Sequence, residues 1–207
     1  MREGEGILVG MDICEDFVQL TYYDRELLSP ESVSREDGEE QYLIPSRLAY
    51  SKRKNEWIIG DDLDKEAKED IFEIKNFFKT VTNGEKIKFI EGSYEAAQLM
   101  EKFIEAALKI LNTYYPFKEI SYMGITFPCV TKEISEVVAS ALKELGFTRE
   151  KYLLLNHDEA FLEYTISQKE ELWTNDTALF ELDEDGLHFR VLSIDKKTEP
   201  MIAKISL

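Results

Sequence analysis

Short runs of apolar residues open the chain and predict β-strands. Residues 6–13 form a largely apolar run that is typical of a buried strand, and residues 17–23 alternate between apolar and polar positions, as a half-buried strand does. Only Cys14, Glu15 and Asp16 lie between the two runs. A connection of that length predicts a β-hairpin.

The next stretch changes in composition and then returns to strand patterns. Residues 29–41 are rich in Ser, Glu, Asp and Gly, which predicts a loop. Residues 47–51 and 56–59 flank a basic tip, Lys52-Arg53-Lys54-Asn55, and predict a second hairpin. In an acidic chain this tip is interpreted either as a solubility feature, or as a contact for an acidic partner or for the protein's own acidic face.

Helical periodicity dominates the middle of the chain. It occurs at about 62–80 and, more strongly, at 93–115. Ser93 and Glu95 precede the apolar positions of the second segment and favour a helix entry there.

The second half alternates strands and helices. Its predicted elements are, in order, a strand at 119–127, a helix at 131–145, a strand at 152–155, a helix at 158–168, and strands at 176–182, 187–195 and 201–207. Strand–helix–strand order implies a parallel pair with a right-handed crossover, whereas the opening hairpins imply an antiparallel part of the same sheet. The pattern therefore predicts an α/β fold built on a mixed five-stranded sheet with flanking helices. The last three strands repeat the opening order, which indicates an internal duplication.

Charge and composition narrow the class of protein. The 207 residues are 43% hydrophobic, which is enough to form a core, and 42 acidic against 25 basic residues give a net charge of −17. Such a chain is a poor partner for nucleic acid or an anionic membrane surface. No apolar run approaches the ~20 residues of a membrane span, the opening run is too short for a signal peptide, and two cysteines make no disulfide framework. We expect a cytoplasmic protein that binds neither nucleic acid nor membrane.

The order of elements resembles the actin, sugar-kinase and seventy-kilodalton heat-shock chaperone superfamily. Five places are similar to the chaperone branch: the opening strand Val9-Gly10-Met11-Asp12-Ile13, the Pro-Ser-x-x-Ala strand at 44–50, Ile59-Gly60-Asp61, the strand end Ile125-Thr126-Phe127-Pro128, and the strand-to-helix turn at 155–160 followed by Tyr164. The ordered set, rather than any single match, carries the resemblance.

The resemblance implies a ribonuclease H-like fold. Residues 1–172 would form the first lobe of an actin-like ATPase, with a helical insertion at about 61–92, and residues 173–207 would form the first strands of a second lobe that stops early. The family closes on Mg-nucleotide between its lobes. Its phosphate loops use glycine N–H groups and hydroxyls as donors, and an aspartate orients Mg²⁺ and its water.

The chain departs from the first phosphate loop of the family. Asp12 matches the loop's aspartate, but the Gly-Thr-Thr that should follow falls on Cys14, Glu15 and Asp16. Carboxylates and phosphates at ~4 Å repel by roughly 4 kcal/mol per pair at an effective dielectric near 20. Several such pairs would abolish ordinary affinity for ATP.

The second loop departs in the same way. Its aspartate position falls on Glu181, and its glycines fall on Asp183, Glu184 and Asp185. The catalytic glutamate of the family falls on His157. The matching positions define a vestigial cleft, which comprises Asp12, Cys14, Glu15, Asp16, Cys129, His157, Glu181 and Asp183.

Cys14 and Cys129 follow strands that are expected to be neighbours, so the two thiols could lie close together with Asp12 and His157 around them. One interpretation is a metal or redox site built from the old nucleotide cleft. The other is two small buried cysteines that act as apolar residues. We favour the second and predict no metal site, because the residues lack any ligand spacing.

The leading hypothesis is a degenerate, non-catalytic actin-like ATPase module, or pseudo-ATPase. It would need no cofactor and would act as a scaffold for an unidentified protein partner within a larger, bacterial-type protein. An exposed strand edge in the second lobe could also pair two copies into a homodimer. The alternative is an atypical Mg-ATP-dependent ATPase in which Asp12 holds Mg²⁺, Glu181 replaces the second aspartate and His157 acts on the water. A third interpretation is a generic α+β adaptor whose matches are coincidental.

Overall fold

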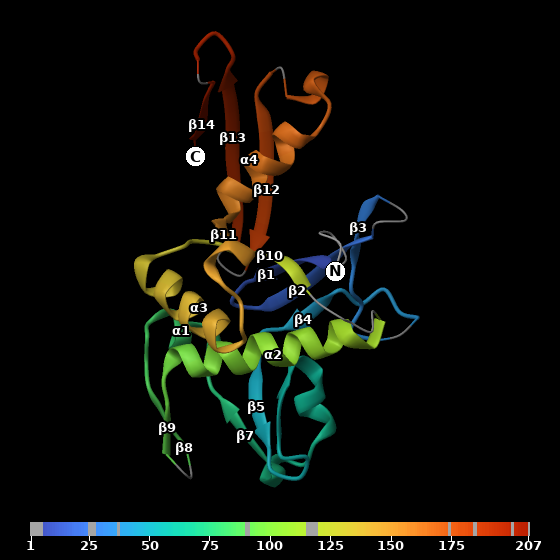
Figure 1. The fold of residues 1–207 in the computed structure, drawn as a ribbon, viewed down its shortest axis with the longest axis vertical. Helices are drawn as coiled ribbons and strands as arrows, with labels where there is room; N and C mark the ends of the chain where they lie inside the picture. Colours follow the sequence, from blue (N-terminus) through green and yellow to red (C-terminus); the bar gives the residue numbers. More distant parts are fainter. Residues whose placement is uncertain are drawn as a thin grey trace. The chain divides into compact units, whose positions relative to one another are not determined.

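The opening apolar run forms the central strand of a mixed sheet in the computed structural model (Figure 1). β1 (Ile7–Ile13) pairs antiparallel with β2 (Phe17–Asp24) and parallel with β10 (Ile120–Phe127). The sheet order is β11-β10-β1-β2-β3, with β11 (Tyr152–Asn156) and β3 (Ser29–Ser32) at the edges. The mixed α/β architecture is therefore as predicted.

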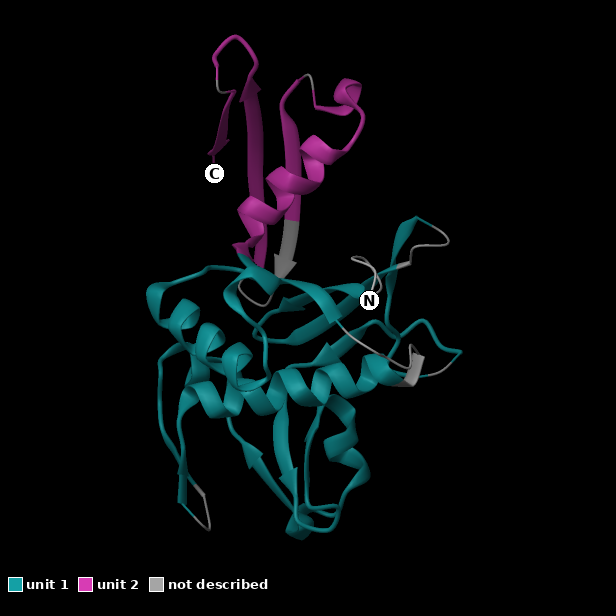
Figure 2. Cartoon of the chain, viewed as in Figure 1, with its two compact units in different colours: residues 1–154 teal, residues 155–207 magenta. Residues whose placement is uncertain are grey.

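The structure describes residues 6–24, 28–36, 38–89, 92–114, 120–173, 175–183, 186–199 and 201–206. By internal contacts the chain forms two compact units, residues 1–154 and residues 155–207 (Figure 2). The lobe boundary at 172/173 rests on the family resemblance alone and stays a prediction.

A short strand replaces the first part of the loop that was expected at 29–41. β3 pairs with positions 21–24 of β2, and β4 (Leu43–Pro45) pairs with positions 17–19 of the same strand. The two short strands share one side of β2, so the sheet is five strands wide although six strands build it. The polar composition misled the prediction because an edge strand keeps half of its side chains in water.

Two amphipathic helices supply much of the core of the first unit. α2 (Ala96–Tyr114) buries Leu99, Phe103 and Leu111, all with 0% exposure. α3 (Lys132–Glu144) is capped by Thr131, whose hydroxyl accepts a hydrogen bond from the N–H of Ile134. In the part of the chain that the structure describes, no helix is long and apolar enough to cross a membrane.

The prediction of a helix over residues 62–80 is wrong. This segment contains 3₁₀ turns at Gly60–Lys65 and Lys68–Asp70, the strand β7 (Ile71–Ile74) and only a short helix, α1 (Phe77–Thr82). β7 pairs with β5 (Leu48–Ser51), whose other neighbour is β6 (Glu56–Ile59), so the predicted second hairpin belongs to a three-stranded sheet. A two-stranded ribbon follows, formed by β8 (Ile87–Phe89) and β9 (Gly92–Tyr94).

The second unit is an antiparallel sheet with one helix. β12 (Thr177–Asp183), β13 (Gly186–Asp195) and β14 (Ile202–Ser206) pair in chain order, as their patterns predicted. α4 (His157–Ser167) begins with a capping box, in which Asn156 and Glu159 each accept a hydrogen bond from the other's backbone N–H.

Candidate functional site

The candidate site lies at the end of β1, where Asp12 stands opposite Thr126 of β10 in the parallel register. The hydroxyl of Thr126 donates a hydrogen bond of 2.6 Å to Oδ1 of Asp12. The thiol of Cys14 donates to the other carboxylate oxygen, Oδ2, at 3.7 Å. Both oxygens of the carboxylate therefore accept hydrogen bonds from the chain itself.

The β1–β2 turn is fixed by backbone and hydroxyl contacts. The N–H of Cys14 donates to the carbonyl of Phe17 at 2.8 Å, which closes the turn. The hydroxyl of the buried Ser46 donates to the carbonyl of Cys14 at 2.8 Å, and the Ser46 N–H donates to the carbonyl of Asp16 at 2.9 Å. These contacts bind the turn to the segment that follows β4.

The β1–β2 turn contains two exposed acidic residues, Glu15 and Asp16. Glu15 makes an ion pair of 2.7 Å with Lys79 of α1, and the two side chains are 48% and 64% exposed. A pair this open to water adds little stability. It does, however, direct the lysine toward a carboxylate of the chain itself.

The other residues of the predicted cleft are distributed between the two units. Cys129 follows β10 in the first unit and is exposed, so it is not the buried cysteine that was expected, whereas Cys14 is partly buried. His157 begins α4, and Glu181 and Asp183 lie on β12, all in the second unit. Glu184 and Asp185 lie outside the described residues.

Sequence reasoning missed two residues of the site, Thr126 and Ser46. Both stand inside the motifs that carried the family resemblance, the Ile-Thr-Phe-Pro strand end and the Ile-Pro-Ser strand. Their roles depend on strand register and on a contact across 32 positions of sequence, and neither is visible in a local pattern.

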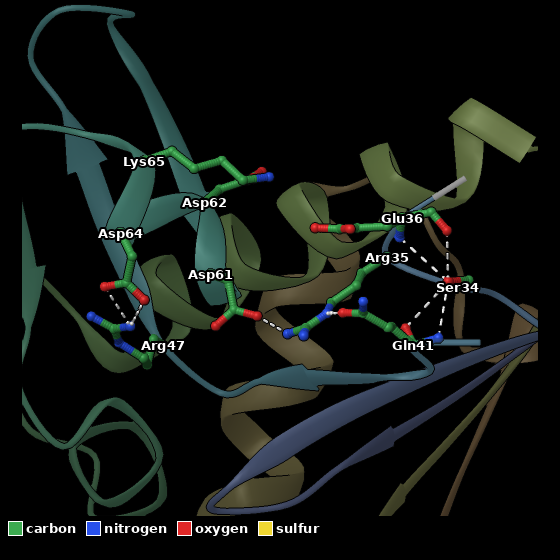
Figure 3. A network of polar contacts seen from close by, with 9 residues as sticks. All are labelled: Ser34, Arg35, Glu36, Gln41, Arg47, Asp61, Asp62, Asp64 and Lys65. Atoms are coloured by element: carbon green, nitrogen blue, oxygen red, sulfur yellow. Dashed lines mark hydrogen bonds and ion pairs between the residues drawn. The ribbon is translucent and has the colours of Figure 1, made fainter. Parts of the chain in front are cut away.

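A polar network joins the loop after β3 to the 3₁₀ turn that follows β6 (Figure 3). Arg35 forms an ion pair with Asp61 and donates from Nε to the side-chain oxygen of Gln41 at 2.7 Å. The hydroxyl of Ser34 donates to the carbonyl of Glu36 at 2.8 Å and accepts from the backbone N–H of Gln41 at 3.2 Å. The loop is thus closed on itself and tied to a distant turn.

Arg47 holds a second part of the same surface together (Figure 3). Its Nη1 donates to both carboxylate oxygens of Asp64, at 2.9 and 3.1 Å, and its Nε donates to Glu73 on β7 at 3.0 Å. The hydrogen bond to Glu73 and then those to Asp64 raise the pKa of Arg47. These carboxylates serve structure, because they bind a cation of the chain.

The basic hairpin tip contacts the protein's own acidic segment, which confirms one of the interpretations offered for it. Arg53 and Lys54 each place a nitrogen 3.0 Å from Oε1 of Glu66, whose side chain is only 1% exposed. Hydrogen bonds from Arg53 and then from Lys54 lower the pKa of Glu66. Lys52 donates to the carbonyl of Glu69 at 2.8 Å. All three basic residues of the tip therefore contact groups of the chain itself.

A small pocket of about 170 Å³ lies between β6 and α2. Its lining comprises Asn55, Glu56, Trp57, Lys102, Glu105, Ala106 and Lys109. The Lys102 ammonium lies 2.8 Å from Glu101 and 3.3 Å from Glu105, and the hydrogen bond to Glu101 raises its pKa against the effect of burial. Two neighbouring carboxylates therefore bind the Lys102 ammonium.

Residues 29–207, most of the chain, match a family described as "Family of unknown function (DUF5716) C-terminal". No curated protein matches the chain. The matched range begins at β3, so the β1–β2 hairpin with Asp12 lies outside it.

Proposed function

We propose that this chain, which belongs to the DUF5716 C-terminal family, is a degenerate actin-like ATPase module that binds protein partners and does not hydrolyse ATP. The observation that carries the proposal is the state of Asp12. Its two carboxylate oxygens accept hydrogen bonds from Thr126 and Cys14, so the group that would orient hydrated Mg²⁺ already has partners within the chain.

The turn after β1 supports the same conclusion. Phosphate binding needs backbone N–H groups that point out of a glycine-rich loop. Here the N–H of Cys14 donates inward to Phe17, and the two residues that follow are carboxylates in place of hydroxyl donors. A triphosphate would meet negative charge without the donors that could offset it.

The sheet order supports a ribonuclease H-like lobe as the scaffold of this module. β1, β2 and β3 form an antiparallel half, and β10 adds to β1 in parallel on its other side. α3 lies in sequence between β10 and β11, which are neighbours in the sheet, as a helical crossover requires. The family resemblance implies a lobe of this kind, and the observed strand order supports that part of the proposal.

A thermal unfolding scan with and without millimolar Mg-ATP or Mg-ADP tests the proposal. A ligand at ~100 times its Kd adds about 2.7 kcal/mol of stability, which is a shift of roughly 5–11 °C for a chain of this size. We expect no shift with either nucleotide. A shift of that order that disappears in Asp12→Ala would overturn the proposal in favour of the ATPase built on Asp12, Glu181 and His157.

A further inference from the structure

The two faces of the β12–β13–β14 sheet differ sharply in burial. On one face, Leu192 of β13 is 1% exposed, and the side chain of Arg190 is 15% exposed. Nε of Arg190 lies 2.6 Å from Oδ1 of Asp158 on α4, which assigns this face to the helix. Residues of odd number on β13 point to the other face, because side chains alternate along a strand.

The opposite face carries large apolar side chains in the open. Phe180 is 64% exposed, Leu187 66%, Phe189 45% and Ile202 47%. Phe180 and Phe189 stand directly opposite each other in the antiparallel register, with ring centroids 4.9 Å apart. Ile202 pairs with Asp195, which places it on the same side of the sheet as Phe189. We call these four apolar residues the open face.

Among the residues that the structure describes, one acidic and one basic residue of β13 and β14 share the side of the sheet that carries the open face. Asp195 on β13 and Lys204 on β14 share this side of the sheet, by their register with Ile202 and Ser193. The chain as a whole carries −17, so a basic partner selected by charge would find better surfaces elsewhere. A flat and apolar sheet face is complemented by a second flat and apolar face. The open face of a second copy of this chain is such a surface.

We infer that the open face is an isologous interface at which two copies of this chain pair. Four large side chains that are about half exposed leave on the order of 400–500 Å² of apolar area per copy, which approaches the ~1,000 Å² in total that separates a specific interface from a casual contact. A two-fold axis places the same patch on both partners, so one aromatic pair would contact its symmetry copy. The inference is independent of the state of Asp12.

Sedimentation equilibrium of the full chain, over about 5–200 µM, tests the inference. We expect the mass to rise from monomer to dimer, with Phe180→Glu weakening the association at least tenfold because it buries a charge at the centre of the interface. Leu172→Glu is the matched control. Leu172 is 66% exposed in the same unit but is not part of the open face, and its substitution introduces the same charge. This control should leave the dimer intact.

Salt gives a second measurement that is independent of these variants. Two chains of −17 repel, so association through an apolar face should tighten as ionic strength rises, whereas association through ion pairs would weaken. A wild-type chain that stays monomeric at 200 µM would overturn the inference. A dimer that Phe180→Glu and Leu187→Lys leave unchanged would do so as well, because the copies would then meet elsewhere, for example at a strand edge.

Discussion

Thr126 donates a 2.6 Å hydrogen bond to Asp12, its direct partner across the parallel strands β1 and β10. The contact links positions that are 114 residues apart and satisfies a carboxylate that the family resemblance assigns to magnesium. Asp12 therefore acts, in our account, as part of the joint between two strands. Its role can be tested without any ligand.

Substituting Thr126→Val should destabilise the chain by about 1–2 kcal/mol, because valine keeps the branched shape and loses a donor to a charged group. Denaturant unfolding measures the difference. Thr126→Ser retains the hydroxyl and should recover most of the loss. A valine variant as stable as the wild type would show that the hydrogen bond contributes nothing to the joint.

Thr21 on β2 leaves little space for a side chain at Gly10. A Cβ at this position would overlap the hydroxyl of Thr21, its register partner. Gly10→Ala should therefore cost about 1–3 kcal/mol by overpacking, and Thr21→Ala in the same chain should recover most of that loss. The matched control is Gly124→Ala on the adjacent strand β10, where a Cβ meets no atom within 4 Å. Equal costs at the two glycines would contradict this packing argument.

The ion pairs at the basic hairpin tip predict a pH dependence. Hydrogen bonds from Arg53 and Lys54 lower the pKa of Glu66, so folding favours its charged form. A carboxyl group whose pKa is lowered by folding stabilises the fold at any pH above its pKa in the unfolded chain, which is near ~4.3. That contribution is lost as the pH falls through the pKa of the group in the folded chain.

Glu66→Gln should accordingly lower the unfolding temperature at pH 7, and the gap to wild type should shrink below pH ~4. Glu69→Gln, at an exposed position three residues away, should change the stability by less than about 0.5 kcal/mol at either pH. If the difference in unfolding temperature between wild type and Glu66→Gln is as large in acid as at pH 7, packing of the side chain, rather than its charge, stabilises the hairpin tip.

The two cysteines should differ in reactivity toward a thiol reagent. Cys129 is exposed, whereas Cys14 is partly buried and its thiol donates to Asp12. We expect one thiol to react at least about tenfold faster than the other in the folded chain, and both to react fast in denaturant. Cys129→Ser should remove the fast phase. If Cys14→Ser removes it instead, the turn is more open than the structure shows.

Local patterns predicted the elements whose apolar period is regular, namely the strands β1, β2, β10 and β11 and the amphipathic helices α2 and α3. They failed at 62–80, where Leu63 and Ile74 are both buried but belong to different elements. The 3.6-residue spacing there arose from two separate segments, and pairing of β7 with β5 decided the structure. The spacing of apolar residues along the sequence does not show which strands will pair.

The candidate site could be predicted only in part. The pattern predicts Asp12 on the first strand and Cys14, Glu15 and Asp16 in the turn after it, because a hairpin is a local structure. The contacts that decide its chemistry come from Thr126 and Ser46, and both depend on the register of strands far apart in sequence.

Calorimetric titration of the full chain with Mg-ATP is the decisive experiment, because it measures nucleotide binding without reference to stability. We expect only heat of dilution up to millimolar nucleotide, both for wild type and for Asp12→Asn. A saturable heat with a Kd below about 100 µM, lost in Asp12→Asn, would show that the Asp12 site binds nucleotide and that the module is not degenerate.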